Sequence, residues 1–261
     1  MKPFSKESLI EELKQIRNRG WIKTQRPNND GAVGNTLEDL LGIKENNLPL
    51  PNAGEWEIKG QRADTSSLIT LFHMEPSPRA FKFVPKILLP KYGWSHKHAG
   101  EKYPHSEKSF RQTLTAGQRT NRGFTLIVNH EKKRVEVSFN SNYVDNEAHE
   151  TWLSEVAKRI GLDELDPVPY WGFDDLYHKA GTKLLKTFYA VAERKRENGI
   201  EYFKYSEIMI LEDFSKEKFI SAIESGLVLA DFDARTGHNH GTKFRLKQDA
   251  YIKLYGSIKH I

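Results

Sequence analysis

The segment Glu55-Trp56-Glu57-Ile58-Lys59 alternates charged and apolar side chains, and this alternation predicts a β-strand. Successive side chains of a strand point to opposite faces, so Trp56 and Ile58 are expected to pack into the core. Glu57 and Lys59 then share the other face. The alternation therefore brings an acid and a cation side by side on a buried sheet.

The segments on either side of this strand predict a mixed α/β (α+β) protein with a mixed β-sheet core flanked by helices. We predict helices from the helical spacing of apolar residues and strands from apolar–polar alternation. The first helix has Ser5 as its N-cap and Gly20 as its stop signal. The expected helices are 6–19, 35–41, 151–160, 173–184 and 215–225; the expected strands are 55–59, 67–72, 227–233 and 242–246; the expected hairpins are 123–129 with 134–140 and 185–196 with 201–211. Residues 74–121, rich in Pro, Gly, Lys, Arg and His, are expected to form long loops with short elements.

Composition narrows the classes of function. The chain has 261 residues and no cysteine, which excludes disulfides, thiolate metal sites and a cysteine nucleophile. Its beginning has no apolar signal-peptide core and no run is long enough to span a bilayer, so a soluble, cytoplasmic protein without membrane partners is expected. The formal charge of +5 suits nucleic acid, although a solvated basic face would give the same value.

The pair Glu57 and Lys59 matches part of what a metal-dependent nuclease needs. Carboxylates hold Mg²⁺ against the scissile phosphate, and a nearby cation steadies the attacking water or the developing charge. The pattern Glu-x-Lys occurs four times in the chain, but only this copy has a supporting set before it, formed by Glu38, Asn52 and Glu55. A surface ion pair on an edge strand remains the alternative.

A second polar cluster occupies residues 233–245 and includes Asp233, Arg235, His238, His240 and Arg245. Arginine binds guanine O6 and N7 as a fork, aspartate accepts from cytosine N4, and histidine donates to guanine, so a strand–loop–strand with these groups suits major-groove readout. A His-x-His metal site or an ordinary polar turn are the alternatives.

The segment that holds His96, His98 and His105 also carries Tyr92, Trp94, Tyr103 and several lysines. Basic groups interleaved with aromatic rings suit contact with a DNA backbone. A packed surface loop would have the same composition.

Four stretches together resemble the MvaI/BcnI family of restriction endonucleases, relatives of the mismatch-repair nicking enzyme MutH. They are Gly34-Asn35-Thr36-Leu37-Glu38-Asp39-Leu40-Leu41, Glu55 to Lys59, PYWGFDDL from Pro169, and DFDARTGHNHGTKFRL from Asp231. The similarity runs from about Gly20 to the C-terminus, and its motifs stand in the right order, which is far more specific than Glu-x-Lys alone.

The resemblance implies one nuclease domain with a PD-(D/E)xK core, a catalytic lobe at about 1–140 and a DNA-recognition lobe at about 141–261. It implies Mg²⁺ dependence, action as a monomer on double-stranded DNA, and CC-N-GG targets, with a methyltransferase as the expected partner of such a system. By position, Glu38, Asn52, Glu57 and Lys59 form the catalytic set. Asn52, Glu57 and Ile58 form the metal-binding set, and Asp233, Arg235, His238, His240 and Arg245 the base-reading set.

One position departs from the pattern, because Asn52 stands where the family has its first metal-binding Asp. An amide oxygen carries no charge, so the metal site should be weakened. An active endonuclease in which Glu55 or Glu38 supplies the charge is expected. A cleavage-deficient DNA-binding protein, a deliberately inactive variant and a MutH-like nicking repair enzyme remain alternatives.

Overall fold

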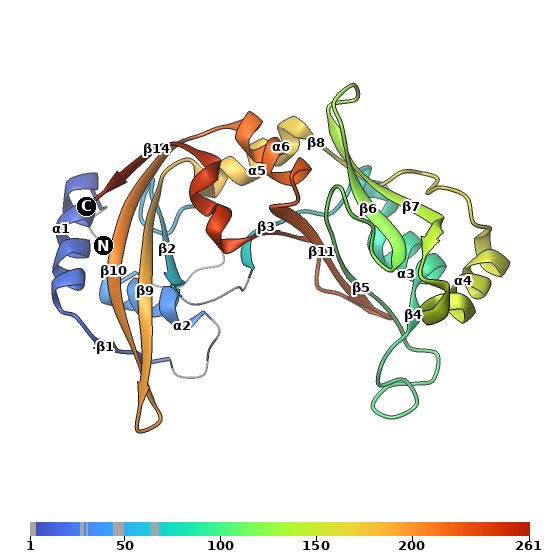
Figure 1. Ribbon diagram of the computed structural model, residues 1–261, viewed down its shortest axis with the longest axis horizontal. Helices are drawn as coiled ribbons and strands as arrows, with labels where there is room; N and C mark the ends of the chain where they lie inside the picture. The colour runs from blue at the N-terminus through green and yellow to red at the C-terminus, as the bar shows by residue number, and fades with distance from the viewer. Residues whose placement is uncertain (1–3, 27–28, 30, 44–49, 64–67) are drawn as a thin grey trace. The chain divides into compact units, whose positions relative to one another are not determined.

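A computed structural model describes residues 4–26, 29, 31–43, 50–63 and 68–261 of the chain. The chain divides into two compact units (Figure 1). Unit 1 consists of Met1–Ser67, His178–Lys218 and Tyr251–Ile261, and unit 2 consists of Leu68–Tyr177 and Phe219–Ala250. Each unit is thus built from separate stretches of chain, whereas the sequence suggested a single boundary near residue 140.

Unit 1 contains a five-stranded sheet in the order β1-β10-β9-β2, with β14 also paired to β10. These strands are β1 (Ile22–Lys23), β2 (Glu57–Arg62), β9 (Thr187–Glu197), β10 (Ile200–Phe214) and β14 (Tyr255–His260). β9 and β10 form a long antiparallel hairpin that turns at Asn198 and Gly199, both with positive φ. β2 runs parallel to β9 at the end of the sheet order, so one of its edges is not paired with any strand of the described residues.

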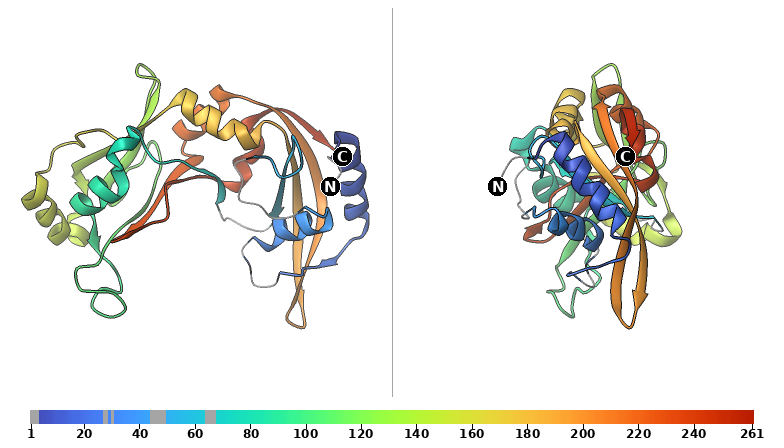
Figure 2. Two further views of the ribbon diagram at one scale, coloured as in Figure 1. Left: turned by 180° about the vertical axis from the view of Figure 1, so that it is seen from behind. Right: turned by 90° about the vertical axis from the view of Figure 1, so that its left-hand side faces the viewer.

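Two helices pack their apolar residues against this sheet. α1 (Lys6–Asn18) begins with a capping box between Ser5 and Ser8 and lies beside β10 in Figures 1 and 2. α2 (Ala32–Leu40) packs against β2. Trp56 and Ile58 are buried in the same apolar cluster as both helices, which confirms the predicted inward face of β2.

α2 approaches β2 backbone to backbone at Gly60. A Cβ atom on Gly60 would lie 3.0 Å from both the Gly34 Cα and the Val33 carbonyl oxygen. The buried Tyr205 hydroxyl of β10 donates a 2.7 Å hydrogen bond to the same Val33 carbonyl. These two contacts fix the distance between α2, which carries Glu38, and β2, which carries Glu57.

Unit 2 combines two sheets around an aromatic core that includes Phe110, Phe124, Phe139, Trp171 and Phe232. The larger sheet has the order β3-β13-β11-β5-β4, with β12 paired to β11, and the smaller has the order β6-β7-β8. The strands are β3 (Ile69–His73), β4 (Trp94–Ser95), β5 (Lys108–Leu114), β6 (Arg122–Asn129), β7 (Arg134–Val144), β8 (Tyr170–Gly172), β11 (Val228–Arg235), β12 (His238–Asn239) and β13 (Lys243–Leu246).

The remaining helices differ in length, and α4 is longer than α1. They are η1 (Arg79–Phe81), η2 (Val84–Leu88), α3 (Leu89–Tyr92), α4 (Asn146–Ile160), α5 (Phe173–Leu184), α6 (Lys216–Glu224) and η3 (Gln248–Leu254). α3 and α4 contact each other within unit 2, and α5, α6 and η3 each begin in one unit and end in the other. Within the described residues, no helix is long and apolar enough to cross a membrane.

The predicted fold class is confirmed, and so are both predicted hairpins. The expectation of long loops over 74–121 was wrong in one respect, because β5 runs through its end as an inner strand of the larger sheet. β14 was not predicted. α2 and α4 begin earlier than expected, at Ala32 and Asn146, and β2 begins at Glu57 rather than Glu55.

Candidate active site and nucleic-acid interface

Glu57 and Lys59 meet on one face of β2. The Lys59 Nζ lies 2.8 Å from Glu57 Oε1, and the Glu57 side chain is only 3 % exposed. The other oxygen, Glu57 Oε2, is buried and has no hydrogen-bond partner among the described residues. A surface ion pair does not describe this arrangement, because a buried carboxylate oxygen without a partner is costly unless another group binds it.

Three buried hydroxyl groups lie on the same side of the sheet as Glu57. Thr187 is the cross-strand neighbour of Glu57, and its Oγ1 lies 2.8 Å from the Tyr255 hydroxyl and 3.5 Å from that of Tyr251. Burial raises the pKa of Tyr255 to about 12 and that of Tyr251 well above its ordinary value, and the charge of Glu57 contributes to both. These hydroxyls therefore stay protonated beside the carboxylate.

Asn52 forms hydrogen bonds with the edge of β2 that does not pair with β9. Its Oδ1 accepts a 2.7 Å hydrogen bond from the Ile58 N–H, and its Nδ2 donates to Glu38 Oε1 at 2.8 Å and lies 3.5 Å from the Ile58 carbonyl oxygen. The backbone N–H can only donate, so the amide oxygen must face it. Asn52 thus connects α2 to β2, and its nitrogen rather than its oxygen faces Glu38.

These residues fit a divalent cation in part. The unpartnered Glu57 Oε2 and the Ile58 carbonyl are oxygen ligands of the kind that Mg²⁺ prefers. Among the described residues, no group of three His, Cys, Asp or Glu side chains is close enough to hold a metal. The predicted role of Asn52 as a ligand remains a prediction; one lone pair of its oxygen accepts the Ile58 N–H, which leaves the second lone pair for a cation.

In unit 2, alternate residues of β11 form a row of charged groups. Asp231, Asp233 and Arg235 share one face of the strand, whereas Ala230, Phe232 and Ala234 are buried on the other. The row is paired with neighbouring strands: Asp233 lies 3.3 Å from Arg111 and 3.6 Å from Lys243, and Asp231 lies 3.3 Å from Arg245. The sheet thus holds acidic and basic side chains at fixed positions, which is the arrangement that contacts with the edges of DNA bases require.

The five residues predicted to read bases are all in unit 2, but their settings differ. Arg235 is about one-third exposed, and His238 and His240 are exposed with ring centroids 4.2 Å apart. Arg245 bonds Asp231 and the Leu68 carbonyl, and its Nε is buried without a partner among the described residues. Arg245 is therefore engaged within the protein, and its predicted base contact remains a prediction.

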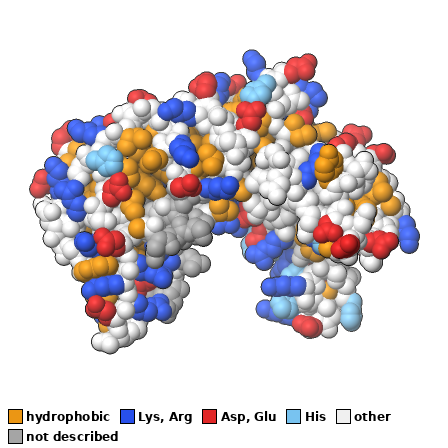
Figure 3. Space-filling view, in the orientation of Figure 1, with side chains coloured by type: hydrophobic (Ala, Val, Ile, Leu, Met, Phe, Trp, Pro, Cys, Tyr) orange, Lys and Arg blue, Asp and Glu red, His pale blue; other side chains and the backbone are white. Residues whose placement is uncertain are grey.

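Sequence reasoning did not single out Glu107, Arg111 and Lys243, which form ion pairs with this row. Arg111 is the most exposed of its arginines, with a side chain 68 % exposed. Arg111 lies in β5 and Glu107 directly precedes that strand; β5 was not predicted, so no local signal placed these residues beside β11. Figure 3 shows Lys, Arg and His side chains gathered at the end of unit 2 that carries β4 and the start of β5.

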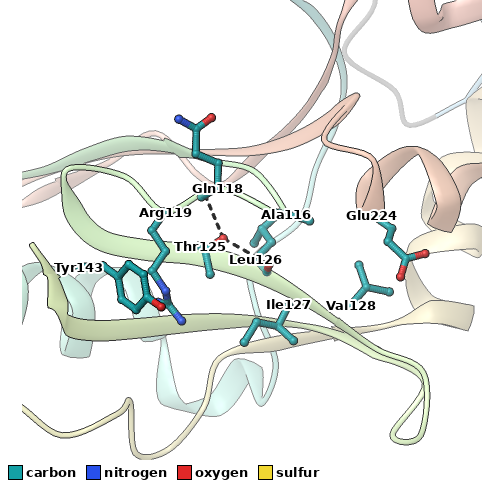
Figure 4. A pocket seen from close by; sticks show the side chains of 10 residues that line it. Ala116, Gln118, Arg119, Thr125, Leu126, Ile127, Val128, Tyr143 and Glu224 are labelled. Carbon is teal, nitrogen blue, oxygen red and sulfur yellow. Dashed lines mark hydrogen bonds between the residues drawn. The ribbon is translucent and has the colours of Figure 1, made fainter.

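A pocket of about 510 Å³ also lies in unit 2, against β6 (Figure 4). Arg119, Thr125, Tyr143 and Glu224 line it, and the Arg119 guanidinium lies 5.2 Å from the centre of the Tyr143 ring. None of the predicted site residues lines this pocket. It is therefore separate from both clusters described above.

Comparison with known proteins decides the family. The family model described as the MvaI/BcnI restriction endonuclease family matches residues 10–255. The chain belongs to this family. Membership in the MvaI/BcnI family confirms the resemblance found in the sequence and makes the protein a restriction endonuclease by family, with DNA as the expected ligand.

Solved structures of one family member share the fold. Restriction endonuclease MvaI in complex with a cognate DNA substrate is 26 % identical with a TM-score of 0.73, and the match covers 98 % of this chain and 99 % of that one. MvaI in the absence of DNA is 24 % identical with a TM-score of 0.59 over 100 % of both chains. Among curated protein sequences, no significant match is found.

Proposed function

We propose that the protein is a sequence-specific endonuclease that hydrolyses phosphodiester bonds of double-stranded DNA with Mg²⁺. The observation that carries the proposal is the buried, unpartnered oxygen of Glu57 beside Lys59, in a chain of a restriction endonuclease family. An ion pair with Lys59 engages only one oxygen of Glu57, whereas a carboxylate that binds a cation can also use the second oxygen.

In this proposal Glu57 and the Ile58 carbonyl would hold Mg²⁺, and the cation would supply charge stabilisation at the scissile phosphate and make water more acidic. Lys59, held 2.8 Å from Glu57, orients the attacking water or stabilises the charge that develops on the phosphate. Glu38 and Asn52 hold α2 and β2 in fixed relative positions. The buried hydroxyls of Thr187 and Tyr255 exclude water from the side of Glu57.

The charged row of unit 2 is proposed to read the DNA sequence. Asp233, Arg235, His238 and His240 offer the donors and acceptors that base edges in the major groove require. The structure of MvaI with its cognate DNA supports DNA as the ligand. From the family resemblance we further propose a target of the CC-N-GG type, action as a monomer, and a methyltransferase of the same system as partner.

The test is to incubate the protein with a plasmid in Mg²⁺ and to sequence the ends of the fragments. Discrete ends at one short sequence, lost in EDTA and in Lys59→Ala, are expected. Random ends would contradict sequence specificity, and cleavage that Lys59→Ala retains would show a contaminating nuclease.

Asn52 favours a second candidate, a DNA-binding protein that does not cut. Its amide nitrogen donates a hydrogen bond to the Glu38 carboxylate. The site therefore offers one acidic group fewer to a cation. Specific binding to a selected sequence without cleavage in either Mg²⁺ or Mn²⁺ would favour this candidate. Cleavage at that sequence would exclude it.

A further inference from the structure

Residues 96–107 form a compact loop between β4 and β5. Its ends are joined by a hydrogen bond of 2.9 Å from the His96 N–H to the Glu107 carbonyl, and Gly100, which has a positive φ, lies against the His105 ring. A side chain at Gly100 would collide with that ring at 2.5 Å. The loop is therefore a defined structure whose side chains have fixed positions.

Two side chains of this loop hold the guanidinium of Arg235. The Glu107 Oε1 lies 3.1 Å from Arg235 Nη1, and the ring centre of Tyr103 lies 4.8 Å from the guanidinium carbon. The Glu107 side chain is only 7 % exposed, and Arg235 is its one ionic partner among the described residues. A buried carboxylate is stable only when it is paired, so Glu107 strongly favours this rotamer of Arg235.

The contacts leave one edge of the guanidinium available. Nη1 is taken by Glu107 and by a 3.5 Å contact to the Thr236 carbonyl, while no protein partner of Nε or Nη2 is found in the described part of the chain. Nε–H and Nη2–H form a parallel fork, which matches the O6 and N7 acceptors of guanine. The guanidinium is thus held by one edge and offers the other.

We propose that Glu107 and Tyr103 are positioning residues for base selection, which fix the Arg235 fork for one guanine. This inference rests on the proposed function, because it assumes that Arg235 reads a base. A pre-oriented fork discriminates against other bases better than a mobile one, since binding no longer has to order the side chain.

The test compares the motifs that the variants select from a library of randomised DNA duplexes. The variants are Glu107→Gln, which keeps the size but removes the charge, Tyr103→Ala, which removes the ring, and Arg235→Lys, which removes the fork. All three are expected to lose about tenfold in discrimination at the same single base pair and to keep the rest of the motif. The matched control is Glu101→Gln in the same loop, whose carboxylate contacts His98 instead and whose loss should leave the motif unchanged.

The outcomes separate this inference from the proposed function. A wild-type protein that selects no motif overturns the proposed function and, with it, the inference. A wild-type motif that Glu107→Gln and Tyr103→Ala both retain unchanged overturns the inference alone. If Glu107→Gln does not fold, Tyr103→Ala decides, because it leaves the ion pair in place. Equal weakening at every base pair would also overturn the inference, since it indicates a structural or phosphate-binding role.

Discussion

At the residue scale, Glu57 and Lys59 could be predicted from sequence because strand alternation alone puts them on one face. Asn52 was noted in the sequence just before them, but its place in the metal site followed only from the family resemblance. Its hydrogen bonds to the backbone of Ile58 could not be predicted, because they depend on where the preceding loop meets the free edge of β2. The hydroxyls of Tyr251 and Tyr255 come from the far end of the chain and had no local signal.

Lys59→Ala and Glu57→Gln are each expected to abolish cleavage and to leave specific DNA binding in Ca²⁺ largely intact. The reason is that both side chains act on the metal and the reacting groups rather than on bases. Cleavage is measured on plasmid and binding by titration of a labelled duplex. Lys14→Ala is the control, since Glu12 and Lys14 form the same sequence pattern but are both exposed on a helix, where side chains two residues apart do not face each other. Binding that falls together with cleavage would make β2 a purely structural strand.

Asn52→Asp is expected to make the stability of unit 1 depend on divalent cations. If its Oδ1 keeps the bond to Ile58, the second oxygen faces the Glu38 carboxylate across the 2.8 Å now spanned by the amide. Without metal, the lost donor and the repulsion should cost about 1–3 kcal/mol of unfolding free energy. A divalent cation should restore this loss, because it binds the folded state. Melting temperatures with EDTA, Mg²⁺ and Ca²⁺ provide the measurement.

The same variant has a pH dependence of defined sign. Repulsion raises the pKa of the carboxyl pair above its unfolded value, so the folded variant holds a proton more firmly than the unfolded chain. In EDTA, the gap to the wild type should therefore shrink as the pH falls from about 8 toward about 4. Asn142→Asp, at an exposed position, is the control and should respond to neither metal nor pH in this way. A gap that stays constant with pH would show that Glu38 and residue 52 do not interact.

At the element scale, the helices and hairpins were the most predictable parts, because α1 and α5 carry clear helical patterns and Asn198-Gly199 marks a turn. β5 was less visible: it is an inner strand next to β11, but its sequence KSFRQTL has no continuous apolar run. One of its faces carries Phe110 and Leu114 into the core, and the other carries Arg111 and Thr113 toward Asp233 and Asp231. β5 forms because it pairs with β11, and this pairing cannot be read from the order of the elements along the chain.

Gly60→Ala is expected to push α2 away from β2 and to lower both stability and cleavage. The added methyl would meet backbone atoms of Val33 and Gly34 at 3.0 Å, and such overpacking costs about 1–3 kcal/mol. Gly34→Ala is the matched control on the facing helix. Its Cβ would meet only the Gly60 carbonyl at 3.9 Å, and the higher helix propensity of alanine should leave stability equal or raise it by up to about 1 kcal/mol.

Urea denaturation and single-turnover cleavage measure the two variants. A Gly60→Ala protein as stable as the wild type would show that α2 shifts without cost. Cleavage that survives such a shift would mean that the distance between Glu38 and β2 does not matter.

At the scale of the whole molecule, the predicted catalytic set lies in unit 1 and the predicted base-reading set in unit 2. The sequence indicated two functions in one chain, but a single boundary could not describe them, since unit 1 is built from three stretches. The reason is the sheet of unit 1, whose strands β2, β9, β10 and β14 come from the beginning, the middle and the end of the chain.

Removal of residues 255–261 is expected to destabilise unit 1 and to leave unit 2 folded. The deletion removes β14, which pairs with β10, and the Tyr255 hydroxyl that bonds Thr187 beside Glu57. Hydrogen exchange should show lost protection in β9 and β10 and unchanged protection in β5, β6 and β11. Loss of protection in both units would show that unit 2 does not stay folded without β14. Unchanged protection in both units would show that β14 is not needed for the stability of unit 1.

The interleaving of the units also constrains the order in which the protein is completed during synthesis. Unit 2 has all of its residues once Ala250 has been added, whereas unit 1 still lacks Tyr251–Ile261. A chain that reaches only to Ala250 therefore holds every residue of the proposed recognition unit, but it cannot surround Glu57 with the hydroxyls of Tyr251 and Tyr255. The unit with the reactive pair reaches its full native packing only when Tyr251–Ile261 have joined it.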